Sequence, residues 1–219
     1  AMRRWVPAGP VAAGMDGMLL HENAALIFLY LIAGSGAAGV YAAAYRLVYV
    51  AISLSMLLSY VYLARATRDM RRSPAEARRT FAWLCIGAVA SGIIFSLTGT
   101  VCARVLVRLL YDPSYAASAW VLQAGVWQMS AAPVRVLSFQ MLNACGAQRR
   151  AVRYIWLSVP VSLLLSGGGA WRYGPVGAAA GTVAGEVLLA ALLWSAAWQQ
   201  VRRGARVHEP DMPVLLEEE

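Results

Sequence analysis

AVRYIWLSVPVSLLLSGGGAWRYGPVGAAAGTVAGEVLLAALLWSAAW, residues 151–198, contains two apolar runs joined by the short segment WRYGP. A helix needs about 20 mostly apolar residues to cross the roughly 30 Å hydrocarbon core of a bilayer. The runs at 151–170 and 176–198 both have this length. Glycine followed by proline is a turn signal, because proline cannot continue a preceding helix. The stretch therefore predicts two transmembrane helices joined by a tight turn.

The same pattern of apolar runs and short breaks extends through most of the chain. Four earlier runs lie at 10–33, 40–63, 80–110 and 116–144. Of the 219 residues, 60% are hydrophobic and 14% are charged, whereas about a quarter of the residues of a soluble domain are charged. The sequence predicts an all-α membrane protein, a six-transmembrane-helix bundle over residues 1–203, followed by a polar cytoplasmic tail at 204–219.

The breaks between the runs carry turn-forming residues. A glycine-rich turn is expected at 34–39, and Tyr111-Asp-Pro-Ser114 ends the third run with a turn signal. Proline is favoured in the first turn of a helix, so Ser73-Pro74 predicts the start of the third helix. Pro133 lies inside the fourth run and predicts a kink there, because it removes one backbone hydrogen bond.

The positive charges predict the orientation of the bundle. All nineteen basic residues are arginines, and the net charge is +8. They lie mainly in the gaps between apolar runs, which is typical of the positive-inside rule, so nucleic acid is excluded as a partner. Fourteen arginines fall on one side of the six runs, three on the other and two within runs. This distribution places both termini in the cytoplasm.

The sequence contains none of the residue patterns on which catalysis commonly depends. It has no GxSxG, HExxH or P-loop motif, and its three cysteines form no CxxC pair, so neither a metal site nor a cofactor site is indicated. We interpret the protein as a transport or binding protein and not as an enzyme.

Charged residues within the apolar runs are the best candidates for a functional site. Such charges are costly in a membrane unless they face a partner or water. At about 1.5 Å per residue, Glu22 and Glu186 lie near the midplane of their spans, while Arg46 and Arg135 lie off-centre. His21 and Asn23 flank Glu22 and place three polar groups at one depth.

Two interpretations of these residues stay open. In the first, a water-filled cavity uses Arg46 and Arg135 to attract an anionic substrate. His21, Glu22 and Glu186 then couple transport to protons or sodium ions. In the second, the arginines pair with the two glutamates, or extend to the membrane surface, and only fix helix packing.

Two periodic patterns add further candidates. Tyr41, Tyr45 and Tyr49 recur every four residues and therefore share a helix face. Tyr41 and Tyr45 are candidate substrate contacts that stack against a sugar, and an ordinary packed stripe is the alternative. The glycines at 177, 181 and 185 form a GxxxGxxxG face that lets helices approach closely. Packing within one bundle is the favoured interpretation of that face, and dimerisation is the other.

Four segments resemble the polysaccharide (O-antigen and lipid-linked oligosaccharide) flippases of the multidrug/oligosaccharidyl-lipid/polysaccharide exporter superfamily. They are AAGVYAAAYRL at 37–47, LLYDPSYAA at 109–117, LNACGAQ at 142–148 and YGPVGAAAG at 173–181. These segments are similar to the start of the family's eighth helix, the turn after the ninth, the end of the tenth and the start of the twelfth.

The resemblance implies one half of a twelve-helix flippase, the carboxy-terminal half, with two bundles that alternate access around a cationic cavity. Arg46 falls on the basic position of the eighth-helix motif, and Glu22 lies near the acidic position of the seventh helix. The chain would then need the missing amino-terminal half or a second copy, and we expect a truncated sequence.

The function implied by the resemblance is the flipping of undecaprenyl-diphosphate-linked oligosaccharide across the bacterial inner membrane. This step serves the biosynthesis of lipopolysaccharide O-antigen and other cell-surface polysaccharides. The expected partners are the lipid bilayer and the lipid-linked oligosaccharide. Two alternatives stay open: a drug or cation antiporter of the same superfamily, and a non-transporting membrane interaction subunit. The sugar, the coupling ion and the oligomeric state are not given by the sequence.

Overall fold

The computed structural model describes residues 8–70 and 74–203, and every regular element in these ranges is helical. In chain order the elements are α1 (Ala8–Met70), α2 (Pro74–Leu110), η1 (Pro113–Tyr115), α3 (Ser118–Gly125), η2 (Val126–Ser130), α4 (Ala132–Ala144) and α5 (Gln148–Arg202). The all-α prediction is therefore confirmed for this part of the chain. The predicted tail at 204–219 lies outside the described residues.

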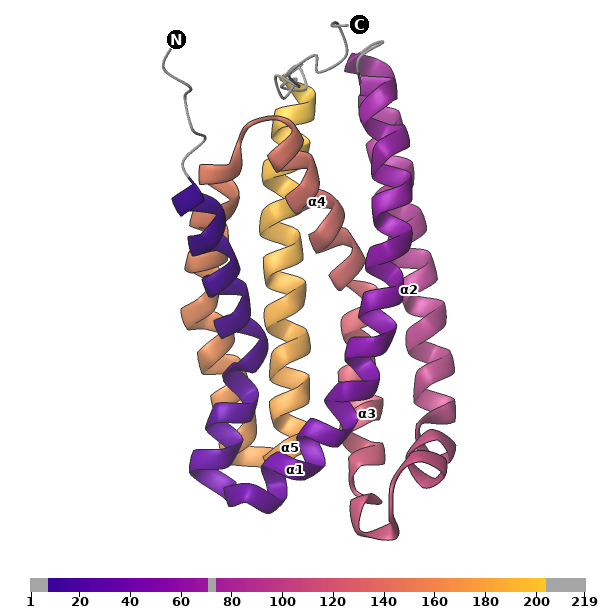
Figure 1. Cartoon of the computed structure of the whole chain (residues 1–219), viewed down its shortest axis with the longest axis vertical. Coiled ribbons are helices and arrows are strands. Elements are labelled where there is room, and N and C mark those ends of the chain that lie inside the picture. Colours follow the sequence, from indigo (N-terminus) through magenta and orange to yellow (C-terminus); the bar gives the residue numbers. More distant parts are fainter. Residues whose placement is uncertain (1–7, 71–73, 204–219) are drawn as a thin grey trace, which may run out of the picture.

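Helices α1 and α5 are each interrupted at a single glycine. Gly34 has φ 79° and Gly174 has φ 61°, a left-handed conformation that only glycine adopts without steric cost. At each interruption the chain turns back along itself, so α1 and α5 both consist of two arms (Figure 1). The turn predicted at 34–39 is too long, because the helix resumes at Ser35. Pro175 begins the second arm of α5, where its missing N–H costs nothing.

The break in the fourth apolar run precedes Pro133. The run is divided by η2, and α4 begins with Pro133 in its first turn. Proline is placed here where its fixed φ suits a helix start. The irregularity predicted at Pro133 is therefore present, shifted by one turn. The other two boundary predictions hold: α2 begins at Pro74, and η1 follows the end of α2 at Leu110.

Close backbone contacts hold the two arms of α5 together. A Cβ atom added to Gly177 would overlap the carbonyl oxygen of Gly169, and one added to Gly181 would overlap that of Leu165. Gly185 also packs closely against the first arm, where an added Cβ atom would overlap the Ser162 side chain. The GxxxGxxxG face therefore contacts the first arm of α5, which supports the interpretation of packing within one bundle.

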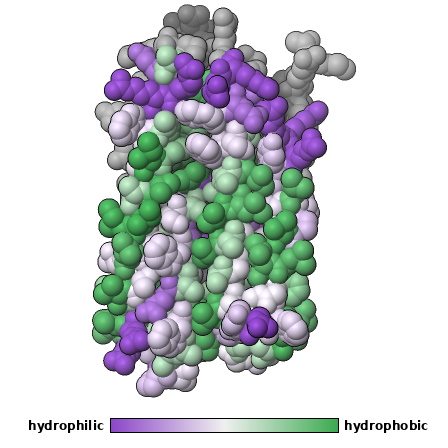
Figure 2. All heavy atoms as spheres, turned by 180° about the vertical axis from the view of Figure 1, so that it is seen from behind, coloured by the Kyte–Doolittle hydropathy of each residue, from purple (hydrophilic) through white to green (hydrophobic). Residues whose placement is uncertain are grey.

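The surface of the bundle is suited to a membrane. Within the described part of the chain, three helical stretches are long and apolar enough to cross a bilayer: Asp16–Ser53, Arg78–Leu110 and Gln148–Arg202. Large side chains such as Leu31, Val101 and Leu164 are more than 70% exposed, and Figure 2 shows hydrophobic residues across the middle of one face with hydrophilic residues at its ends. These features are consistent with a membrane protein, and the count of six crossings stays a prediction.

Candidate functional site: a buried ionic cluster

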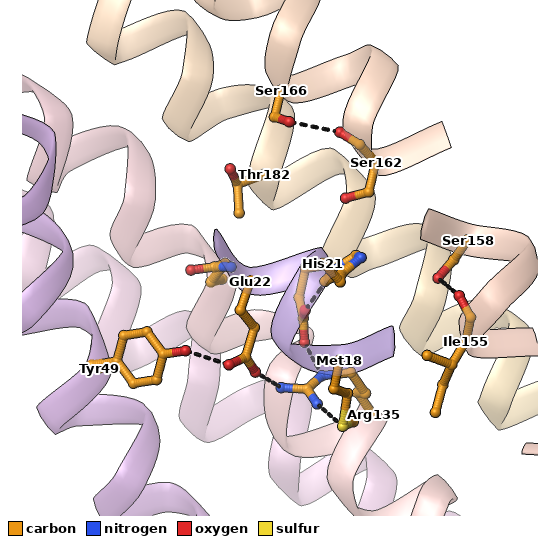
Figure 3. A network of polar contacts seen from close by, with 12 residues as sticks. Met18, His21, Glu22, Tyr49, Arg135, Ile155, Ser158, Ser162, Ser166 and Thr182 are labelled. Carbon is orange, nitrogen blue, oxygen red and sulfur yellow. Dashed lines mark hydrogen bonds and ion pairs between the residues drawn. The ribbon is translucent and has the colours of Figure 1, made fainter. Parts of the chain in front are cut away.

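An arginine lies at the centre of the candidate site. Arg135 belongs to the first turns of α4 and is only 4% exposed. Its Nε donates a hydrogen bond to Glu186 Oε1 at 2.5 Å, and its Nη2 lies 3.5 Å from Glu22 Oε1. Glu22 comes from the first arm of α1 and Glu186 from the second arm of α5. The guanidinium thus connects three helices that are far apart in sequence (Figure 3).

A histidine completes the cluster on its buried side. His21 is 2% exposed, and its Nε2 lies 3.4 Å from Glu186 Oε2. Its Nδ1 has no hydrogen-bond partner among the described residues. With His21 neutral, one guanidinium faces two carboxylates, which leaves one negative charge in a low-dielectric interior, a costly arrangement. One bound proton or monovalent cation would bring the charge of the cluster to zero.

The opposite side of the cluster is partly open. The Glu22 side chain is 23% exposed, and its Oε2 accepts a hydrogen bond from the Tyr49 hydroxyl. Arg46 lies one turn before Tyr49 on α1, and Asn23 follows Glu22; both are exposed. We call Glu22, Arg46 and Tyr49 the polar face. Glu22 belongs to both the polar face and the buried cluster, so it connects the two.

The three tyrosines form a continuous ladder along the second arm of α1. The ring centroids of Tyr41 and Tyr45 are 5.1 Å apart, and those of Tyr45 and Tyr49 are 5.3 Å apart. Gln128 Nε2 donates to the Tyr45 hydroxyl at 3.0 Å, and the Tyr41 and Thr182 hydroxyls are 3.3 Å apart. Tyr41 is almost fully buried, which favours packing over sugar stacking at that position. The ladder ends on Glu22 through Tyr49.

The structure brings most of the predicted site residues together. His21, Glu22, Arg135 and Glu186 form one cluster, and Tyr41 and Tyr45 reach it through Tyr49. Arg46 lies apart from the cluster, on the polar face. For Arg135 the pairing interpretation describes the geometry, because both glutamates contact its guanidinium.

The sequence analysis missed two polar contacts of this region. Gln128 anchors the middle of the tyrosine ladder, and the Sδ of Met18 lies 3.6 Å from Arg135 Nη1. Gln128 left a usable signal, since a glutamine inside an apolar run needs a buried hydrogen-bond partner. Met18 left none, because methionine is an ordinary residue of membrane spans.

Comparisons with family models, with curated proteins and with solved structures find no match to this chain. The function must therefore be argued from the cluster and its surroundings. What the geometry establishes is a shared ionic group, buried between α1, α4 and α5, that reaches the surface through a single carboxylate.

Proposed function

We propose that this chain is one half of a transporter that flips lipid-diphosphate-linked oligosaccharide across the inner membrane. The observation that carries the proposal is Glu22, which contacts buried Arg135 on one side and exposed Tyr49 on the other. Ionisable residues at membrane depth are expensive and usually mark a pathway or a coupling site. An ion pair that served only to fix helix packing would not need a carboxylate that is partly exposed to the surface.

The proposal includes six membrane crossings with both termini in the cytoplasm. The arms of α1 and α5 would supply four crossings, α2 a fifth, and α3, η2 and α4 together the sixth. In Figure 1 both ends of α1, the start of α2, the α4–α5 connection and the end of α5 lie at one end of the bundle. Among the described residues, Arg78 and Arg79 near the start of α2, Arg149, Arg150 and Arg153 at the start of α5, and Arg202 and Arg203 at its end belong to this end, which supports a cytoplasmic side under the positive-inside rule.

The geometry suggests a division of roles among the candidate residues. Arg135 is balanced by Glu186 and Glu22, so a diphosphate could reach it only by displacing Glu22, the more distant carboxylate. Arg46 is exposed on the polar face, and no carboxylate of the described residues forms an ion pair with it. We assign the anionic part of the substrate to Arg46, and ion coupling to the cluster of His21, Glu22, Arg135 and Glu186.

A lone bundle would present the polar face to the opposite half of the transporter. Glu22, Arg46 and Tyr49 would then line a cavity between two halves, and a second bundle would supply the other wall. That second bundle is an amino-terminal half or a second copy of this chain. The exposed large hydrophobic residues beside this face, such as Leu20 and Val50, would contribute to the contact between halves or to lipid.

Replacing Arg46 with Gln is expected to lower oligosaccharide translocation about tenfold or more, with unchanged protein level. A charge-assisted hydrogen bond contributes about 1.5–3 kcal/mol, and each 1.4 kcal/mol is a factor of ten. The measurement is transfer of labelled lipid-linked oligosaccharide across proteoliposomes or glycan export in cells. Arg108→Gln, an exposed arginine near the end of α2, is the matched control and should transport normally.

The same assay separates the alternatives to the proposal. Movement of organic cations in place of the glycan would indicate a drug or cation antiporter. Absence of any transport, together with stable co-purification of a glycan polymerase, would indicate an interaction subunit. Normal glycan transport by Arg46→Gln would remove the substrate role that we assign to Arg46.

Replacing Glu22 with Gln is expected to uncouple transport from the ion gradient. Glutamine keeps the size of the side chain and can still accept the Tyr49 hydrogen bond, but it removes the charge that a proton or sodium ion would neutralise. Translocation should fall to the rate seen without an imposed gradient. Asn23→Ala changes the neighbouring exposed residue and should keep the gradient response; an unchanged response in Glu22→Gln would contradict the coupling role.

A further inference from the structure

A second feature of the bundle lies away from the polar face and plays no part in the proposed transport. It is a groove of about 800 Å³ between α2, the η2–α4 segment and the second arm of α5. Its walls are almost entirely apolar and include Ala90 and Ile93 of α2, Val134 of α4, and Ala191 and Trp194 of α5. We call it the α2–α5 groove.

The length of the groove matches one leaflet of a bilayer. Along α2 it extends from Ala82 to Ile93, which is twelve residues or roughly 16 Å at the helical rise of about 1.5 Å. The hydrocarbon core of a membrane is about 30 Å thick, so one leaflet takes about half of that. The groove therefore accommodates the hydrocarbon chains of a single leaflet and does not cross the membrane.

Positive charge gathers at one end of the groove. The ring of Phe81 stacks on that of Trp198 with centroids 6.4 Å apart, which brings the start of α2 beside the end of α5. Arg78 and Arg79 precede Phe81, and Arg202 and Arg203 follow Trp198 by about one turn; all four are exposed. Glu76, in the first turn of α2, contributes one negative charge here, so the four arginines leave this end of the groove with a net positive charge. An apolar groove that ends in arginines is complementary to a lipid with a negative headgroup.

We propose that the α2–α5 groove binds an anionic phospholipid of the surrounding bilayer, with its acyl chains against α2 and α5 and its phosphate on the arginines. This inference is independent of the proposed function. A bilayer phospholipid is favoured over a polyprenyl substrate because the groove and the buried cluster use different sides of the same helices. Val134 and Val187 line the groove, whereas their neighbours Arg135 and Glu186 turn to the cluster.

A lipid bound in the α2–α5 groove would also affect the structure of the bundle. The lipid would fill the space behind α4 and the second arm of α5, the two elements that form the 2.5 Å contact between Arg135 and Glu186. An unfilled groove loses van der Waals contacts along its lining. The bound lipid would therefore support the ionic cluster from its far side.

The proposal is tested by photocrosslinking in nanodiscs of phosphatidylcholine. The full chain is mixed with a small fraction of phosphatidylglycerol that carries a diazirine at mid-chain, and crosslinked peptides are mapped by mass spectrometry. We expect crosslinks in residues 82–93 and 187–198, with a yield several times that from phosphatidylcholine carrying the same diazirine. Each arginine at the surface contributes about 1 kcal/mol toward an anionic lipid, about fivefold in affinity.

Two pairs of variants decide the outcome. Arg78→Gln with Arg79→Gln should lower the preference for phosphatidylglycerol severalfold, because only Arg202 and Arg203 remain, whereas Arg108→Gln at the opposite end of α2 should keep it in full. Ala191→Phe fills the groove and should remove the crosslinks, whereas Ala180→Phe, at an exposed position of α5 outside the groove, should not. Equal yields from both lipids would overturn the proposal. The proposal would also be overturned if a small amount of added polyprenyl phosphate competed away the phosphatidylglycerol crosslinks. The groove would then bind polyprenyl phosphate in preference to the phospholipid.

Discussion

Replacing Arg135 with Met is expected to destabilise the bundle by about 3–5 kcal/mol, the usual cost of removing one partner of a buried ion pair. The substitution leaves Glu186 buried at 1% exposure with His21 as its remaining charge partner. It also leaves Glu22 without the guanidinium that faces it at 3.5 Å. The effect is large because the missing charge is not replaced by water at this depth.

The measurement is thermal or denaturant unfolding of the protein in detergent, monitored by tryptophan fluorescence. Arg135→Met combined with Glu186→Met should recover most of the loss, because replacing both members of a buried pair with apolar side chains is often neutral. Arg108→Met removes an exposed arginine and should change stability little. A single variant as stable as the original protein would show that the pair does not hold α4 against α5.

Replacing Gly169 with Ala is expected to destabilise the protein by about 1–3 kcal/mol, the range for overpacking a tight contact. The added methyl group would overlap the carbonyl of Gly177 on the opposite arm of α5. Backbone cannot turn aside as a flexible side chain can, so the two arms must separate. Alanine favours a helix by up to about 1 kcal/mol over glycine, and the steric effect has to exceed that gain.

The neighbouring residue provides the control for this prediction. A Cβ atom on Gly168 meets nothing within 4 Å, so Gly168→Ala should be neutral or stabilising by up to about 1 kcal/mol. The two variants each add one methyl group, at adjacent positions of the same helix. Opposite signs in the unfolding temperature would support the close approach of the arms, and equal effects would contradict it.

The sequence was sufficient to predict that the protein is all-helical and where most of its helices lie, because both depend on local composition. The two reversals were located to within a few residues, since glycine and proline mark them, but their length was overestimated at Gly34. A run of glycine and alanine looks like a loop in sequence. The structure shows that one glycine with positive φ makes the break and that its small neighbours remain helical.

The candidate site was harder to predict than the helices. Depth along a span follows from counting residues, so Glu22 and Glu186 were both expected near the midplanes of their spans, and in the structure both contact Arg135. Which side of each helix they occupy depends on packing, and that is set by contacts distant in sequence. Arg135 illustrates the difficulty: the 3₁₀ segment η2 lies immediately before α4 and interrupts the helix that the apolar run predicts, and apolar periodicity does not reveal such a segment.

The single-glycine reversals at Gly34 and Gly174 have a consequence for how the chain is made. A connection of one residue provides no loop long enough to remain outside the membrane while the first arm inserts by itself. Under the proposed topology, each pair of arms must therefore leave the insertion machinery as a preformed hairpin. Biogenesis of this bundle would then proceed in units of two crossings, with the second arm of α1 and the second arm of α5 each delivered together with its predecessor.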